Sequence, residues 1–185
     1  AVGVVGKNKI LSKNKIKKND LVLAIPSSGL HSNGYSLVRY VLNQKKINIK
    51  KNLFLKTELI RPTKIYVKEV LKLIDKNLIN GCSNITGGGL ADNIKRVVPD
   101  NLIAEINLDK VKTSKIFKWL KKNDISDKEM LKTFNCGVGF ILIINAKNLN
   151  KVKKFFTMNF KPYIIGKISR GKNKVKLNGS INWIK

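Results

Sequence analysis

Apolar residues recur along this chain in two patterns, and each pattern predicts one kind of secondary structure. Continuous or alternating apolar runs predict strands at residues 2–5, 20–28, 79–86, 102–108, 137–144, 163–168 and 174–179. Apolar residues spaced three and four positions apart predict helices at residues 35–43, 90–97, 115–122 and 150–158. The two kinds of element alternate irregularly and end in an expected hairpin. The sequence therefore predicts an α+β fold, with a mixed sheet covered by helices.

Local signals refine the ends of several elements. Arg61-Pro62 is expected to open a further helix, because proline is favoured in the first helical turn. Ser32 or Asn33 is expected to cap the helix at 35–43. The segment "SDKE" at 126–129 fits a capping box that would start another short helix. No internal repeat interrupts the pattern, so residues 1–185 are expected to form a single domain.

The composition favours a folded protein of the cytoplasm. A hydrophobic content of 43% in 185 residues is enough to bury a core. No apolar run reaches the ~18–20 residues that cross a bilayer, and "AVGVVGKNKIL" at the N-terminus lacks the features of a signal peptide. Cys82 and Cys136 lie far apart in apolar or glycine-rich surroundings. They are interpreted as reduced thiols, with a disulfide as the less favoured alternative.

The formal net charge of +27 raises the question of a nucleic-acid partner, because lysine and arginine neutralise phosphates. Only four of the 38 basic residues are arginine, and the lysines are spread along the whole chain with little aromatic interleaving. Lys, Asn and Ile, whose codons are AT-rich, account for 79 of 185 residues. We therefore favour a solvated surface shaped by nucleotide composition over nucleic-acid binding.

The only histidine lies in a segment unlike the rest of the chain, "IPSSGLHSNGYSL" at residues 25–37. Small hydroxyl residues and glycines around it suit a loop that faces a ligand. His31 could act as a general base, donate to a phosphate, or fasten its own loop. No carboxylate or cysteine accompanies it, so the pattern contains neither a catalytic dyad nor a set of metal ligands.

Three junctions that contain glycine follow predicted strands, at residues 27–34, 86–89 and 135–139. Glycines ahead of a helix let backbone N–H groups approach an anion, which the helix N-terminus also favours. Gly87-Gly88-Gly89 has this arrangement, although a tight turn without a ligand is the alternative. It matches neither a Walker A loop nor a dinucleotide fingerprint. Asn93 could cap the following helix, and Asn135 could be a ligand contact or a turn residue.

Four segments of the chain resemble the phosphoribosylformylglycinamidine cyclo-ligase family, within the AIR synthase-related superfamily. They are "AIPSSGLHSNGYSLVR", "RPTKIYVKEVL", "ITGGGLADNIKRVVPDN" and "EMLKTFNCGVGF". Their order and spacing are similar to those in the C-terminal half of the family, and the resemblance runs from "VGVV" near the start to "IIGKI" near the end. The combination is specific, since other branches of the superfamily are not expected to carry these segments together.

The resemblance implies a three-layer fold, with helices on both faces of the sheet, and a ring closure in purine synthesis. Formylglycinamidine ribonucleotide and ATP would give aminoimidazole ribonucleotide, ADP and phosphate. Phosphoryl transfer would activate the formyl oxygen before a nitrogen attacks that carbon, chemistry that depends mainly on positioning and charge stabilisation. ATP and Mg²⁺ would be held mainly by an N-terminal domain, and the full enzyme would be a homodimer.

On this chain the resemblance implies a catalytic role for His31 and substrate contacts from the three junctions. The expected contacts are Ser27, Ser28, Gly29, Ser32, Asn33, Gly87, Gly88, Gly89, Asn93 and Asn135. No metal ligand is implied, and neither ATP nor Mg²⁺ is expected to be held by this chain alone.

The chain departs from the family in two respects. Asp92-Asn93-Ile94-Lys95 stands where the family usually has Glu-Asn-Ile-Pro, and aspartate has the shorter reach, so Asn93 is the more secure contact. The family's N-terminal ATP-binding domain, with its acidic metal ligands, has no counterpart here. We therefore expect the C-terminal domain of a cyclo-ligase, as a fragment or the product of a split gene. A basic nucleic-acid-binding module and a non-catalytic remnant are the alternatives.

Overall fold

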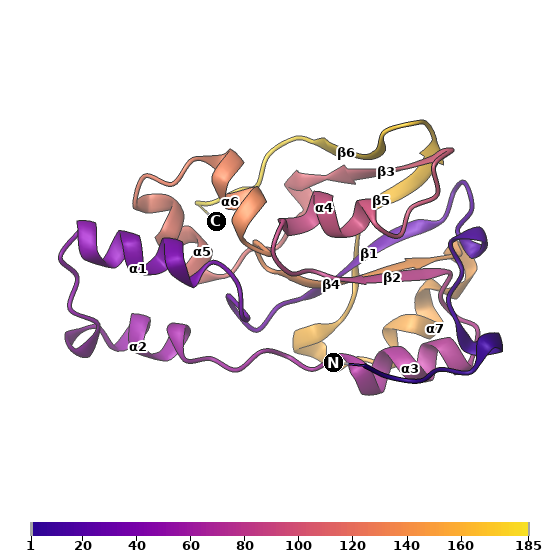
Figure 1. The fold of residues 1–185 in the computed structure, drawn as a ribbon, viewed down its shortest axis with the longest axis horizontal. Helices are drawn as coiled ribbons and strands as arrows, with labels where there is room; N and C mark the ends of the chain where they lie inside the picture. The colour runs from indigo at the N-terminus through magenta and orange to yellow at the C-terminus, as the bar shows by residue number, and fades with distance from the viewer. Residues whose placement is uncertain (1, 185) are drawn as a thin grey trace.

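The computed structural model describes residues 2–184, which form one mixed sheet and seven α-helices (Figure 1). The strands are β1 (Leu21–Pro26), β2 (Gly81–Asn84), β3 (Leu102–Asn107), β4 (Val138–Ile144), β5 (Tyr163–Arg170) and β6 (Lys174–Asn178). The helices are α1 (Tyr35–Gln44), α2 (Leu53–Leu59), α3 (Val67–Asp75), α4 (Gly89–Lys95), α5 (Lys115–Lys122), α6 (Asp127–Thr133) and α7 (Leu149–Lys153). None of these helices has the length and apolar character of a membrane span.

The sheet has the strand order β2-β4-β1-β5-β3-β6. All neighbouring strands are antiparallel except β3 and β6, which are parallel. The expected hairpin at the end of the chain is therefore wrong. Strand β5 pairs with β1 and β3, so its edges are both occupied, and β6 lies beyond β3 as an edge strand.

Helices cover both faces of the sheet, and two cores result. On β1, Val22 and Ala24 belong to a core with residues of α1, α2, α4, α5 and α6, whereas Leu23 and Ile25 belong to a core with α3 and α7. Successive strand residues point to opposite faces, so this alternation identifies two packed layers of helices around the sheet. In Figure 1, α3 and α7 lie together along the lower edge of the view. The expected α+β fold with three layers is confirmed.

Three expectations about local structure are wrong. Residues 2–5 form no strand, and the side chains of Val2 and Val4 are fully exposed. Residues 61–66 are not helical, and α3 begins only at Val67. Gly34, with φ of +82°, occupies the N-cap position of α1 in place of Ser32 or Asn33, and no side chain caps this helix. The capping position at α6 is confirmed, because Ser126 Oγ accepts a hydrogen bond from the Glu129 N–H.

The antiparallel pairing brings three chain segments to one end of the sheet. Pro26 at the end of β1 is paired with Val138 at the start of β4, and Asn84 at the end of β2 is paired with Phe140. The connections that leave β1 and β2 therefore meet the connection that enters β4. These connections contain the three glycine junctions.

Candidate functional site

Hydrogen bonds hold the three junctions close together at this end of the sheet, one between the first and third and one from the residue that precedes the second. The Ser27 N–H donates to the Gly137 carbonyl over 2.9 Å, and the Ile85 N–H donates to the Gly139 carbonyl over 3.0 Å. The Asn33 side chain also lies near Gly87, since a Cβ atom built on that glycine would be 3.6 Å from Asn33 Oδ1. The segments predicted separately from the sequence thus form one cluster, which we call the junction site (residues 27–34, 86–89 and 135–139).

His31 lies behind the surface of the junction site, with only 6% of its area exposed. Its Nε2 accepts a hydrogen bond from the Ser28 N–H over 3.2 Å, so the ring holds the turn that it belongs to. Burial lowers the pKa of this imidazole. The contact matches the loop-fastening role considered for His31, and its catalytic role stays a prediction.

Asn135 connects the first junction to the third. Its Nδ2 donates to the carbonyls of Gly29 and Leu30, over 2.9 and 3.2 Å. Its Oδ1 accepts from the Gly137 N–H over 2.9 Å. The side chain is 2% exposed, and its amide is committed to the backbone. Of the two roles considered for Asn135, this geometry is that of a turn residue.

Asn93 has a similar function in the second junction. It is buried on α4, and its Nδ2 lies within hydrogen-bond distance of the carbonyls of Thr86, Gly87 and Gly89. Its Oδ1 accepts from the Thr86 hydroxyl over 3.0 Å. Asn93 therefore fixes the shape of the glycine turn, and the groups left for a ligand are those of the turn itself.

The three glycines of that turn differ in what their amides do. The Gly89 N–H donates to the Thr86 carbonyl over 3.2 Å, whereas the amides of Gly87 and Gly88 have no hydrogen bond within residues 2–184. The Asp92 carboxylate lies beside Gly88, since a Cβ atom built there would be 2.8 Å from its Oδ2. A carboxylate at this position already interacts favourably with the start of α4 and opposes a second negative charge.

The extended segment 61–66, which the sequence analysis assigned to a helix, forms one wall of the junction site. Ser28 Oγ donates to the Pro62 carbonyl over 2.8 Å and accepts from the Lys64 N–H over 3.0 Å. Ser32 Oγ and Thr63 Oγ1 lie 3.3 Å apart. A residue before proline favours extended backbone, which accounts for Arg61, whereas residues 63–66 carry no such local signal.

Tyr66 and Arg61 also belong to this wall and were missed from the sequence. The Tyr66 hydroxyl donates to the Pro26 carbonyl over 2.8 Å, and its ring centroid lies 6.1 Å from that of His31. Arg61 forms an ion pair with Glu58, and its side chain lies beside Gly29. This cation beside the first junction is thus held by a carboxylate on α2.

Within residues 2–184, no group of three or more His, Cys, Asp or Glu side chains could hold a metal ion. No step considered below uses a metal ligand from the described residues.

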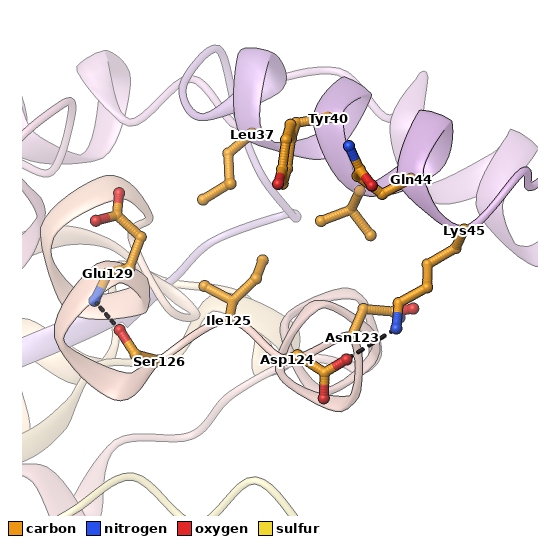
Figure 2. A pocket seen from close by; sticks show the side chains of 10 residues that line it. Leu37, Tyr40, Gln44, Lys45, Asn123, Asp124, Ile125, Ser126 and Glu129 are labelled. Carbon is orange, nitrogen blue, oxygen red and sulfur yellow. Dashed lines mark hydrogen bonds and ion pairs between the residues drawn. The ribbon is translucent and has the colours of Figure 1, made fainter.

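A separate cavity of about 520 Å³ lies between α1 and the connection from α5 to α6 (Figure 2). Leu37, Val41 and Ile125 form its apolar part, and an ion pair of 2.8 Å between Lys45 and Asp124 closes one end. None of the residues predicted from the sequence as site residues lines this cavity.

Comparisons with known proteins show which family has this arrangement. A profile described as "AIR synthase related protein, C-terminal domain" matches residues 17–178. The chain belongs to the AIR synthase-related family. Within it, the chain is 44% identical over 173 residues to a phosphoribosylformylglycinamidine cyclo-ligase of Streptococcus pyogenes serotype M4, which confirms the resemblance. That alignment covers 91% of this chain and 50% of the relative, so the chain spans about half the length of the curated relatives it matches.

Solved structures show the same fold in more distant proteins. This chain superposes on a thiamine-monophosphate kinase from Stenotrophomonas maltophilia with a TM-score of 0.67 and 16% identity, covering 96% of this chain and 56% of that one. It superposes on Thermotoga maritima PurL complexed with AMPPCP with a TM-score of 0.56 and 13% identity, covering 91% and 24%. At these identities the likeness concerns the fold alone.

Proposed function

We propose that this chain supplies the substrate side of an ATP-dependent cyclo-ligase, which converts formylglycinamidine ribonucleotide to aminoimidazole ribonucleotide in purine synthesis. The observation that carries the proposal is the junction site, where three separate segments meet at one end of the sheet. The 44% identity to cyclo-ligases supports the choice of reaction. The whole chain is proposed to act as one domain of that enzyme.

The proposal divides the predicted site residues into two groups. His31, Asn93 and Asn135 are buried and bonded to the backbone, so they set the shape of the loops. Ser32 and Gly87 are exposed at the surface of the junction site. We place the substrate there, with the Gly87 amide toward its phosphate, because the Asp92 carboxylate beside Gly88 opposes a negative charge at that end of the turn.

Positioning is the contribution that such loops can make to this chemistry. Ring closure needs the nucleophilic nitrogen held against the activated carbon, and a fixed geometry of this kind lowers the barrier substantially. The loops are suited to it because hydrogen bonds from the Asn93 and Asn135 side chains hold their backbone. His31 is proposed to take part through the ring nitrogen that does not accept from Ser28.

ATP and Mg²⁺ are proposed to bind mainly to a polypeptide that corresponds to the N-terminal half of the curated relatives. The complete enzyme is proposed to be a cytoplasmic homodimer. One structural neighbour, Thermotoga maritima PurL, was solved with the nucleotide AMPPCP, in keeping with nucleotide use on this fold.

The test is a reconstitution from two purified parts. The 185-residue chain is mixed with the N-terminal half of the Streptococcus pyogenes cyclo-ligase, and ADP release that depends on formylglycinamidine ribonucleotide is measured. We expect turnover from the mixture and none from either part alone, because each contributes one side of the active site. A mixture without the ribonucleotide is the control.

Two results would contradict the proposal in different ways. Robust, substrate-dependent ADP release by the 185-residue chain alone would contradict the division of the site between two parts. A complex that forms between the two parts but gives no turnover would contradict the proposed reaction.

A further inference from the structure

The cavity between α1 and the connection from α5 to α6 has no part in the proposed function (Figure 2). We call it the α1 cavity. It is lined on one side by α1, between Leu37 and Lys45, and on the other by residues 123–126 and Glu129. Its volume of about 520 Å³ lies within the range of sites that bind small molecules.

The floor of the α1 cavity is apolar and belongs to the packed core. Val41 and Ile125 line it and are only 4% and 7% exposed. Tyr40 stands at the rim with 60% of its surface exposed, and Figure 2 shows its ring beside Leu37 on the same wall. An aromatic ring beside an apolar floor fits a ligand with a flat, apolar body.

Several polar groups of the lining have no partner in the described part of the chain. One oxygen of the Glu129 carboxylate accepts from the Thr133 hydroxyl, and the other has neither a hydrogen bond nor an ion pair there. Asn123 donates through Nδ2 to the Trp119 carbonyl over 2.8 Å, which leaves its Oδ1 free. The charged group among these is the carboxylate, which accepts hydrogen bonds and cannot donate them.

The lining of the α1 cavity reverses the charge of the chain as a whole. It contains the carboxylates of Asp124 and Glu129 and one cation, Lys45, whereas the chain has 38 basic and 11 acidic residues. Lys45 and Asp124 neutralise each other across 2.8 Å at one end, and Figure 2 shows Glu129 at the other end. A ligand in contact with Glu129 interacts with that carboxylate more strongly than with lysines beyond the lining, because the interaction weakens with distance and is screened by salt.

We propose that the α1 cavity binds a small organic cation with a flat apolar body, whose amidinium or guanidinium group pairs with Glu129. Such a group presents two parallel N–H donors, which match the two oxygens of a carboxylate. The oxygen that accepts from Thr133 has a second lone pair for the ligand. The apolar body lies on Val41 and Ile125, and the Tyr40 ring faces the cation. The inference does not depend on the proposed reaction.

Benzamidine, which is a cation at neutral pH, is the probe. Benzamide and benzoate have nearly the same shape but are neutral and negatively charged. Each compound is titrated into the ¹⁵N-labelled 185-residue chain, and the backbone amide signals are followed by NMR. We expect benzamidine to bind with a dissociation constant of about 1 mM, the order of magnitude for so small a ligand. The signals that shift should belong to residues 37–45 and 123–129.

The two other compounds test whether charge selects the ligand. Benzamide should bind at least about 10-fold more weakly than benzamidine, because it lacks the charge that strengthens the hydrogen bonds to Glu129. Benzoate should not shift the signals of the cavity at about 10 mM. This comparison uses the unaltered chain, so it does not depend on any variant.

Glu129→Gln tests the position of the cation. Its amide oxygen can still accept from the Thr133 hydroxyl, so the melting temperature should stay within a few degrees of the unaltered chain. Benzamidine should bind this variant about 10-fold more weakly, and benzamide within about twofold of its affinity for the unaltered chain. Glu105→Gln is the matched control, because Glu105 lies on β3, outside the cavity, and it should change neither affinity.

Four results would overturn the inference. They are equal affinities for benzamidine and benzamide, binding of benzoate in the cavity, and no shift of the cavity signals at about 10 mM benzamidine. The fourth is benzamidine binding that Glu129→Gln leaves unchanged, since the cation would then associate with carboxylates elsewhere on the surface.

Discussion

Three consecutive glycines in the junction site illustrate how neighbouring residues of one type can have different functions. Gly88 and Gly89 adopt φ of +91° and +63°, a backbone region that favours glycine, whereas Gly87 does not. A Cβ atom on Gly89 would collide with the Leu131 carbonyl oxygen, but one on Gly87 would have only Asn33 Oδ1 nearby, at 3.6 Å. The fold therefore requires glycine at position 89. Nothing in the described fold requires glycine at position 87.

This difference gives a matched pair of substitutions. Gly89→Ala should destabilise the protein by about 2 kcal/mol or more, because it adds both an unfavourable φ and a collision with backbone. Gly87→Ala should change the free energy of unfolding by no more than about 0.5 kcal/mol, yet weaken substrate binding in the reconstituted enzyme if the amides of the turn face the phosphate. Urea denaturation and the KM for the ribonucleotide measure the two effects. Equal stability of both variants would contradict this account of the turn.

His31 should make stability depend on pH in a defined direction. Its folded pKa is lowered from 6.5 by burial, so at pH below 6.5 the unfolded chain binds a proton that the folded chain resists. The stabilising contribution is complete above pH 6.5 and is lost as the pH falls below that value. The melting temperature should therefore decrease between pH 7.5 and pH 5.5.

His31→Gln provides the comparison, because a glutamine amide oxygen can still accept from the Ser28 N–H but does not titrate. The chain has one histidine, so the variant should show a flatter profile over the same range. Identical profiles for the two proteins would remove His31 as the cause. In the reconstituted enzyme, a loss of about 100-fold in turnover by His31→Gln, without a lower melting temperature at pH 7.5, would support the catalytic role.

At the scale of elements, the shape of the junction site depends on contacts between one connection and another. Asn135 belongs to the connection that enters β4, yet both of its donor bonds go to the connection that leaves β1, more than a hundred residues earlier. The shape of the junction site thus depends on a side chain that belongs to neither β1 nor α1.

Asn135→Ala should show how much this tie contributes. The substitution leaves the buried Gly29 carbonyl, Leu30 carbonyl and Gly137 N–H without their partner, which should cost about 2–3 kcal/mol. Asn159→Ala, at an exposed position, is the control and should change stability by less than about 0.5 kcal/mol. Chemical denaturation measures both. A change in Asn135→Ala as small as in the control would show that the loop is held by its backbone alone.

The elements that could be predicted from the sequence are those whose pattern is local. The alternation on β3 and the apolar stripe of α1 specified these elements nearly to their ends. The pairing of β6 with β3 could not be predicted, because a short edge strand carries no sign of which neighbour it will choose. Segment 61–66 was assigned to a helix because proline is favoured in the first helical turn, whereas proline also favours extended backbone at the residue before it.

The candidate site could be predicted only as a set of residues. The motifs identified the three junctions, but not that His31 and Asn135 would turn inward and bond to backbone, since this depends on contacts between distant segments. Tyr66 and Arg61 were not recognised, because their relation to His31 and Gly29 exists only after α3 has packed on the sheet.

At the scale of the whole molecule, charge acts on association. The six ion pairs within residues 2–184 leave most lysines without a carboxylate partner. Such a surface repels further copies of itself and attracts acidic partners over a distance of about 10 Å at moderate salt. The interpretation that nucleotide composition produced the lysines stays a prediction.

The position of β1 in the sheet has a consequence for how the chain acquires its structure. This strand is the first along the chain, but its two neighbours are residues 138–144 and 163–170. During synthesis, Val22 to Ile25 therefore emerge long before either partner strand exists. Contacts between such distant segments form slowly, and an apolar strand with two unpaired edges is prone to aggregate meanwhile. Once β4 and β5 have paired with β1, both edges of β1 are covered. A strand that stays unpaired during most of synthesis thus ends as an interior strand of the sheet.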